Sequence, residues 1–393
     1  MAPPSLATTA NPADPLDIGR LRHENVSEKQ MKIEYPSANK REMRKFYARQ
    51  NDLIDQYLGS NDEERVSGEE SDRVGPKIKF AINASFTVNF CLFVIQLYAA
   101  ITTGSSLFAT AADAFMDLVS SCVMLATSRM ASKPKLHKFP VGRTRMETIG
   151  VILFCALMTT VAIELLVSTL AFDAAKLDTY QGAVQIESGR TLGSGHSESG
   201  EQLNIAPLIC VCVAIAAKFS LMCYCFLYRK HPSVHVFFID HRNDIFVNSF
   251  GLIMSVIGER FVWYLDPIGA ICIALLILFS WVSNAFEQVW LLVGKGAPPE
   301  YISKLIYIAM THDPNISKVD TCRAYHAGQK CYVEIDIVMD PETPLRHSHD
   351  VSQSLQRKLE GLADVERAFV HVDYEYEHDV HEEHKPLFDR TKS

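Results

Sequence analysis

The chain has 393 residues, of which 48% are hydrophobic, a formal net charge of −8 and a mean hydropathy of +0.04. The length allows two or three domains, and the negative charge gives no argument for binding nucleic acid. The near-zero hydropathy is an average over two polar ends and an apolar middle. The first residues, MAPPSLATTANPADPLD, lack a charged start followed by an apolar run, so we expect no secretory signal peptide.

Residues 1–75 form a polar N-terminal region that we expect to be partly disordered. Its first part, to about Glu34, contains prolines and few large apolar residues, a composition that cannot bury enough apolar surface to fold. Residues 38–58 could form a charged helix with four apolar positions: Phe46, Leu53, Ile54 and Leu58.

Six apolar segments follow within residues 76–295, each close to the roughly 20 residues that cross a bilayer. They are 80–101, 106–128, 148–170, 205–228, 236–258 and 268–292. We therefore predict a domain of six transmembrane helices.

The loops between these segments predict the orientation. The loop after the second segment is basic, and the loop after the fourth contains Arg229 and Lys230. The loop after the first has no Lys or Arg, and residues 171–204 contain only Lys176 and Arg190 among several acids. The positive-inside rule then places both termini in the cytosol. The long loop 171–204 should be flexible and face the opposite side.

Residues 296–376 read as a small cytosolic α+β domain, followed by a polar tail, 377–393. A helix begins at the prolines near Glu300, two strands meet at a turn formed by AGQK, and a second helix precedes a third strand. Thr343 is the expected N-cap of that second helix. Its expected apolar positions are Leu345, Val351, Leu355, Leu359 and Leu362. The order αββαβ predicts a ferredoxin-like fold.

Four aspartates in the apolar segments are the strongest functional signal. The second segment contains Asp113 and Asp117, and the fifth contains Asp240 and Asp244, each pair spaced i, i+4. This spacing places both carboxylates of a pair on one helix face. Ionisable groups at bilayer depth are expensive and usually functional. Four ionised carboxylates would repel one another unless some bind protons or a cation lies among them, so the pattern predicts a divalent metal site.

The ligand types bear on which metal binds. Carboxylate oxygens suit hard cations such as Mn²⁺ and Mg²⁺, whereas a zinc site more often includes imidazole or thiolate. Asn89 and Asn248 could each be an additional ligand or a hydrogen bond between helices. His241 is turned about 100° from Asp240 along a helix, which favours an interface residue over a ligand. In the alternative interpretation, Asp240 has only a structural role and caps a helix at the membrane interface.

Other polar residues leave more than one interpretation open. We expect Glu164, Lys218 and Glu287 to be buried, with Lys218 paired to an acid on another helix, more as a structural element than a functional one. The C-terminal histidines, among them His347, His349 and the run HDVHEEH in the tail, could bind a regulatory metal.

The residues resemble the cation diffusion facilitators, and in detail their manganese-transporting branch, which includes plant metal tolerance proteins. The resemblance rests on the two DxxxD motifs, on HKFPVGRTRME after the second segment, on DHRNDIFVNSFGL with GERFVWYLDPIGA, and on RAYHAGQKCYVEIDIVM with VERAFVHVDYEYEH. It covers roughly residues 78–380. The chain departs from the pattern in its long loop 171–204 and in Arg242–Asn243, where aromatic residues are common.

The resemblance implies a homodimeric transporter, with no cofactor, that moves Mn²⁺ out of the cytosol in exchange for protons. It implies an endomembrane location, such as the vacuole or Golgi, and a C-terminal domain that holds the dimer together. The implied ligands are Asp113, Asp117, Asp240 and Asp244, with Asn89 and Asn248 as possible helpers. Asp240 stands where the zinc branch typically has His, although a Zn²⁺ or broad-range exporter remains the alternative within the family.

Intramembrane aspartyl proteases also use paired aspartates, but they contain a GxGD motif that this sequence lacks. Two DxxxD pairs also exceed the two single acids that such chemistry needs. A channel or a membrane-tethered metal sensor stays open at this point.

Overall fold

The computed structural model describes residues 14–22, 40–103, 108–133, 137–187, 205–257 and 265–377. Its internal contacts divide the chain into a helical unit, Arg73–Val293, and a terminal unit, Met1–Asp72 together with Gly294–Ser393. Each unit has an apolar core of its own, so each is described by itself.

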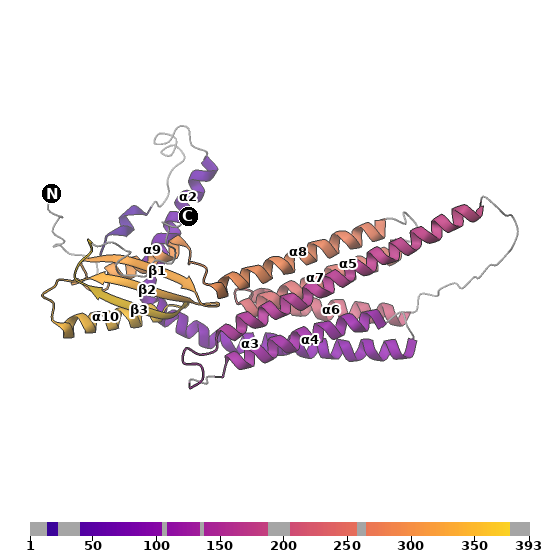
Figure 1. Cartoon of the computed structure of the whole chain (residues 1–393), viewed down its shortest axis with the longest axis horizontal. Helices are drawn as coiled ribbons and strands as arrows, with labels where there is room; N and C mark the ends of the chain where they lie inside the picture. Colours follow the sequence, from indigo (N-terminus) through magenta and orange to yellow (C-terminus); the bar gives the residue numbers. More distant parts are fainter. Residues whose placement is uncertain are drawn as a thin grey trace, which may run out of the picture. The chain divides into compact units, whose positions relative to one another are not determined.

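The helical unit consists of long helices that run alongside one another (Figure 1). Each of the six predicted apolar segments coincides with one of them, apart from residues 106, 107 and 258, which lie outside the described residues, and residue 228, which begins a turn. The helical nature of the segments is therefore confirmed. The helices are α3 (Ser60–Thr103, of which the part from Arg73 belongs to this unit), α4 (Phe108–Ala131), α5 (Arg145–Glu187), α6 (Ile205–Leu227), α7 (Pro232–Ile257) and α8 (Leu265–Val293).

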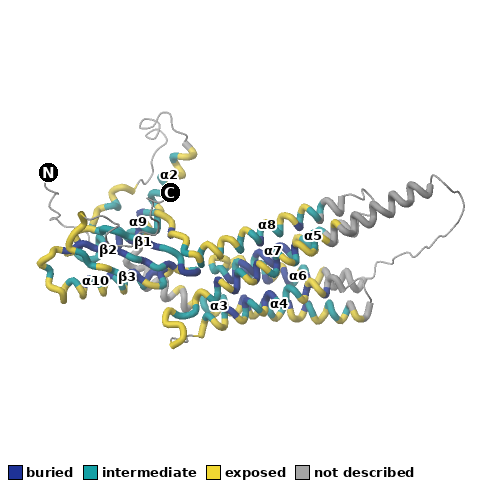
Figure 2. Tube along the Cα trace, viewed as in Figure 1, coloured by how far each residue is buried: buried dark blue, intermediate teal, exposed yellow. Residues whose placement is uncertain are grey.

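The surface of the helical unit is typical of a membrane domain. Among the described residues, four stretches are long and apolar enough to cross a bilayer: Arg73–Ala99, Ala111–Ala131, Arg145–Val167 and Ile271–Val293, with a shorter apolar stretch at Cys212–Leu227. Buried residues gather where helices meet, while the outer faces are exposed (Figure 2). These outer faces are apolar: Leu276 is 71% and Phe279 is 76% exposed, which a soluble domain would avoid.

Two helices extend beyond the segments predicted to be apolar. Helix α3 begins at Ser60, well before the predicted span, and includes Pro76. Helix α5 continues to Glu187, so the prediction that a loop begins at residue 171 was wrong. The residues of these extensions include good helix formers, namely Glu in α3 and Ala, Gln and Glu in α5. Hydropathy therefore marks where a segment is apolar, but it does not mark where the helix begins or ends.

Aromatic packing holds three of these helices together. The ring centroids of Phe154 on α5 lie 5.6 Å from those of Phe237 on α7 and of Trp281 on α8. All three side chains are almost fully buried. Since Asp240 lies one turn beyond Phe237, this packing fixes the part of α7 that carries the carboxylates.

The C-terminal part of the terminal unit is the predicted αββαβ domain. Its elements are α9 (Pro299–Met310), β1 (Lys318–His326), β2 (Cys331–Val338), α10 (Leu345–Glu360) and β3 (Val365–Asp373). The sheet order is β1-β2-β3, with β1 antiparallel and β3 parallel to β2. A parallel neighbour after a hairpin requires a crossover, which α10 provides. The hairpin at 327–330 and all three strands agree with the sequence prediction.

One apolar core joins both helices to the sheet. Alternate residues of β2, namely Val333, Ile335 and Ile337, are fully buried against Leu305 of α9 and Leu355 of α10. Two details of α10 were predicted wrongly. Its N-cap is Pro344, with no side-chain cap, and Leu345 is 84% exposed. The proline fixes the backbone angle φ where the chain enters the helix, and the backbone N–H groups of His347 and Ser348 donate to its carbonyl oxygen. Leu345 precedes the turns that face the sheet.

The predicted charged helix of the N-terminal region is present as α2 (Lys40–Leu58). It packs against α9: the rings of Tyr57 and Tyr307 stack with centroids 5.4 Å apart, and Arg49 pairs with Glu300. Within residues expected to be disordered, a short 3-10 helix, η1 (Ile18–Leu21), is described. An N-terminal element thus covers part of the C-terminal domain.

We expect Leu355→Ala to destabilise the C-terminal domain by about 3 kcal/mol, because the side chain is fully buried and its removal leaves a cavity. Leu345→Ala is the matched control, since it makes the same substitution at an exposed position of the same helix and should change stability by less than about 0.5 kcal/mol. Urea denaturation of the two variants, followed by circular dichroism, measures both. Equal effects would show that the core is not as described.

Candidate metal-binding site

Helices α4 and α7 carry the four aspartates as two pairs. Asp113 and Asp117 are one turn apart on α4, and Asp240 and Asp244 are one turn apart on α7. Helix α7 begins at Pro232, so Asp240 lies two turns inside it. The alternative in which Asp240 caps the start of a helix is therefore excluded.

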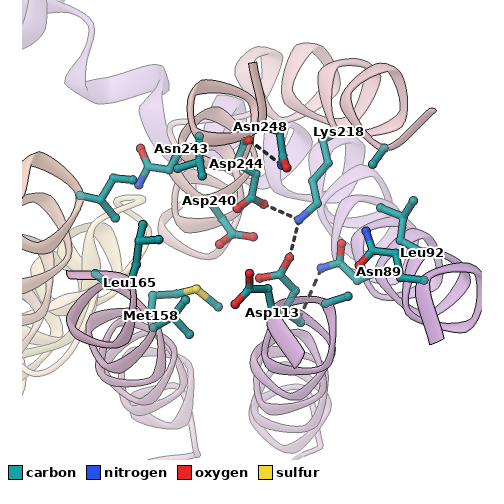
Figure 3. A pocket seen from close by; sticks show the side chains of 18 of the residues that line it. Asn89, Leu92, Asp113, Met158, Leu165, Lys218, Asp240, Asn243, Asp244 and Asn248 are labelled. Atoms are coloured by element: carbon teal, nitrogen blue, oxygen red, sulfur yellow. Dashed lines mark hydrogen bonds and ion pairs between the residues drawn. The ribbon is translucent and has the colours of Figure 1, made fainter. Parts of the chain in front are cut away.

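A cavity of about 180 Å³ collects all six residues predicted as metal ligands (Figure 3). The four carboxylates come from α4 and α7, and two amides, Asn89 of α3 and Asn248 of α7, also line the cavity. The carboxylates of Asp113, Asp240 and Asp244 point toward one another in Figure 3. Asp240 is the most deeply buried of the four, and Asp113 is the most exposed. The tertiary structure therefore turns the two helix faces toward each other, as a shared site requires.

The remaining wall of the cavity is mostly apolar. Met158 and Leu165 come from α5, and Ile277 and Trp281 come from α8. Apolar walls keep the local dielectric low, which strengthens both the repulsion between carboxylates and their attraction to a cation. Residues whose role the sequence did not suggest are Asn243 and Gln96, which also line the cavity. Asn243 is one turn from Asp240 on α7, and this spacing in the sequence could have indicated that Asn243 also lies at the cavity.

Lys218 of α6 is the residue whose role the sequence left undefined. Its ammonium lies 2.7 Å from a carboxylate oxygen of Asp117 and also pairs with Asp244. One basic side chain thus bridges an acid of α4 and an acid of α7. The expected pairing of Lys218 across helices is confirmed, and its partners are two of the four aspartates.

The two amides differ in what they already bond. Asn89 donates through its side-chain nitrogen to Ser121 Oγ at 2.8 Å and to the backbone oxygen of Asp117 at 3.4 Å. Asn248 donates to the backbone oxygen of Asp244, in its own helix, at 2.8 Å. Asn89 therefore joins α3 to α4, and in both residues the side-chain nitrogen is engaged while the oxygen is the atom suited to a cation. Both interpretations, as a ligand and as a contact between helices, fit Asn89, whereas the hydrogen bond of Asn248 lies within α7 and supports no contact between helices.

His241 is fully buried behind Asp240. Its Nε2 lies 3.1 Å from Ser85 Oγ, and its Nδ1 lies 3.8 Å from a carboxylate oxygen of Asp240. It does not line the cavity, although one ligand atom each from Asp240, His241 and Asp244 lie within 4.8 Å of one another. The imidazole contacts α3 on one side and Asp240 on the other, in the way a second layer orients a metal-binding carboxylate.

Other predicted polar residues lie elsewhere. Glu164 and Glu287 are exposed on the helical unit and do not line the cavity, so the expectation that they are buried was wrong. His347 contacts Asn315 at 3.0 Å on the exposed side of α10. The histidine run HDVHEEH begins at residue 378 and lies outside the described residues, so regulatory metal binding there stays a prediction.

Comparison with known families identifies the arrangement. Residues 82–293 match the cation efflux transmembrane domain, and residues 297–375 match the cytoplasmic domain of cation efflux proteins. The chain belongs to the cation efflux family. The cavity described above lies within the part that matches the transmembrane domain, and the αββαβ fold is the part that matches the cytoplasmic domain.

Several relatives cover most of the chain. It is 34% identical over 348 residues to metal tolerance protein 7 of Oryza sativa subsp. japonica, a match that covers 86% of this chain and 84% of the relative. Metal tolerance protein 10 of Arabidopsis thaliana is 32% identical over 353 residues, a match that covers 86% of this chain and 76% of the relative. Metal tolerance protein 11 of the same plant is 34% identical over 317 residues, with 80% and 75% covered.

Membership of this family settles the class of function. The chain is a membrane protein that transports divalent metal cations, and it is not an enzyme. The aspartyl protease alternative is thereby excluded. The same membership confirms the fold class, a helical transmembrane domain followed by a cytosolic domain with a small mixed sheet.

Proposed function

We propose that this protein moves Mn²⁺ out of the cytosol in exchange for protons, with Asp113, Asp117, Asp240 and Asp244 as the metal ligands. The observation that carries the proposal is the convergence of these four carboxylates on one cavity between membrane helices. Asn89 and Asn248 are proposed as additional oxygen donors. The transported ion is the substrate, and no resident cofactor is needed.

The donor set favours Mn²⁺ over Zn²⁺. The described residues that line the cavity offer carboxylate and amide oxygens and include no His or Cys, a combination that suits a hard cation. The alternative, a Zn²⁺ or broad-range transporter, has one observation in its favour. The imidazole of His241 is close enough to Asp240 and Asp244 to join a three-ligand site. Its contact with Ser85 argues for the orienting role instead.

Proton exchange follows from the chemistry of carboxylates in a confined cavity. Metal and protons compete for the same oxygens, so binding of one displaces the other. Repulsion among four carboxylates keeps some of them protonated until a divalent cation neutralises the group. Metal affinity should therefore fall as the solution becomes more acidic, and protons entering from the far side of the membrane would expel the metal.

We place the parts of the chain as follows. Residues 76–295 form the transmembrane domain, and residues 296–376 form a cytosolic domain that holds a homodimer together. Residues 1–75 and 377–393 lie in the cytosol. The concentration of Lys and Arg in the loops after the second and fourth spans supports this orientation. An endomembrane location, such as the vacuole or Golgi, would make the transport a route for storing or secreting Mn²⁺.

The orientation can be tested with a protease site inserted near Gly195. In sealed vesicles with the cytosolic face outward, we expect this site to resist added protease until detergent opens the vesicles. The same site placed after Ser393 should be cut without detergent and serves as the control. Cleavage near Gly195 in intact vesicles would reverse the proposed orientation.

The proposed function is tested with purified protein in vesicles that contain a manganese-sensitive dye. An imposed pH gradient, acidic inside, should drive Mn²⁺ uptake, and uptake should release protons from the vesicle interior. If collapsing the gradient leaves the initial rate unchanged, proton exchange is excluded, and a channel becomes the better explanation. Binding of Mn²⁺ without any uptake would contradict Mn²⁺ as the transported ion. Competition with Zn²⁺ in the same assay ranks the metals.

A further inference from the structure

We infer that the ammonium group of Lys218 is a built-in counter-cation, which neutralises the site when the transported metal is absent and which the metal must displace to bind. The inference rests on the proposed function and adds a residue that no ligand assignment includes. It predicts that Lys218 weakens metal binding and, by doing so, permits metal release.

The first argument for this inference is the position of Lys218. Its side chain is 7% exposed, and its ammonium contacts Asp117 on α4 and Asp244 on α7. In Figure 3 the nitrogen lies between the carboxylates of the two helices. The two acids that it contacts are thus divided between the two metal-binding helices, one in each DxxxD pair. If Lys218 only held α6 against a neighbouring helix, one partner would be enough, and that partner would not have to belong to the site.

The second argument is the balance of charged side chains in the cavity. Among the described residues that line the cavity, Lys218 is the single basic one and faces four acids. An unpaired carboxylate in an apolar cavity is costly, so a nearby cation stabilises it. A divalent ion that reached Asp117 and Asp244 would need the same oxygens and would be repelled by the ammonium. Metal and ammonium therefore exclude each other from these two carboxylates.

The third argument is the chemistry of the lysine side chain. An ammonium on a flexible four-carbon stem is a compact point charge that can be displaced, whereas a planar arginine would hold two carboxylates in a fixed geometry. A divalent ion has twice the charge of the ammonium and attracts the carboxylates that line the cavity more strongly. The metal should therefore occupy the carboxylates of Asp117 and Asp244 when its concentration is high. The tethered ammonium should pair with them again when the metal leaves. The charge of the empty site is then compensated with fewer protons.

The competing explanation is that Lys218 only fastens three helices together. The two explanations predict opposite results for Lys218→Met, which keeps an unbranched side chain and removes the charge. A counter-cation predicts Mn²⁺ binding that is tighter by about tenfold, together with slower turnover because release is impeded. A structural fastener predicts equal or weaker binding.

The test compares the full chain with Lys218→Met and Lys230→Met by titration calorimetry with Mn²⁺ and by vesicle transport. Lys230 is an exposed lysine just after α6, so Lys230→Met makes the same substitution away from the cavity and should match the parent. If the parent neither binds nor transports Mn²⁺, the proposed function fails. If the parent does both and a folded Lys218→Met binds Mn²⁺ no more tightly, only the counter-cation inference is overturned.

A second measurement uses the parent protein and decides the matter even if Lys218→Met does not fold. Dicyclohexylcarbodiimide joins an amine directly to a neighbouring carboxyl, and peptide mass spectrometry identifies the joined residues. We expect a Lys218–Asp244 or Lys218–Asp117 link without metal and a several-fold lower yield with saturating Mn²⁺. A yield that Mn²⁺ does not change, or no such link in either condition, would overturn the inference.

Discussion

Replacing Asp244 by Asn should lower the initial rate of Mn²⁺ transport by about 100-fold or more, a change of roughly 2.7 kcal/mol in the transport barrier. The substitution keeps the size of the side chain but removes a negative charge from the cavity, so both the metal and the ammonium of Lys218 lose an anionic partner. Asp117→Asn should act similarly, because Asp117 is the other partner of Lys218. The measurement is dye-reported uptake into vesicles under an imposed pH gradient.

Folding and membrane insertion should survive these substitutions, because a neutral amide costs less at bilayer depth than a carboxylate. Glu287→Gln is the matched control. Glu287 is an acid on a helix of the same unit, but it is exposed and does not line the cavity. It should therefore transport at the rate of the parent. Transport by folded Asp244→Asn at the parental rate would remove Asp244 from the site.

The second large effect concerns selectivity. Asp240→His should shift the ratio of Zn²⁺ to Mn²⁺ transport toward Zn²⁺ by about tenfold or more, because imidazole is a softer ligand than carboxylate. Asp240 is the most buried of the four acids, and His241 already lies behind it. The new imidazole would therefore enter the cavity, with the imidazole of His241 directly behind it, and an imidazole ligand favours zinc. Competition between the two metals in the vesicle assay measures the ratio.

His241→Gln provides the comparison for this experiment. If His241 orients Asp240, as its contact with Ser85 suggests, removing it should weaken the binding of both metals without changing their ratio. If it is itself a ligand, the ratio should move further toward Mn²⁺. An unchanged ratio in Asp240→His would show that Asp240 does not contact the transported ion.

The sequence predicted the C-terminal domain closely, because short-range patterns determine it. Along β2, Val333, Ile335 and Ile337 alternate in the sequence with Tyr332, Glu334 and Asp336 and form the buried face, and the turn AGQK predicted the hairpin. The failures lie at the start of α10. There Thr343 was expected to cap and Leu345 to be buried, and a single periodic pattern could not tell which turn first meets the sheet.

In the helical unit, the sequence located apolar segments but not the ends of helices. Helix α3 begins some way before its apolar segment, and α5 continues beyond its own. The physical reason is that hydropathy measures preference for lipid, whereas helix formation depends on backbone hydrogen bonds and helix propensity. Polar residues such as Glu and Gln form helices readily.

By itself, the sequence determined that two pairs of acids, Asp113 with Asp117 and Asp240 with Asp244, each lie on one face of a membrane helix. That conclusion needs only the period of the helix and the cost of charge in lipid. Only the tertiary structure decided that the two faces turn toward one cavity and that Lys218 stands between them. The partner of a buried charge depends on how helices distant in the sequence pack together, and no local pattern in the sequence records that packing.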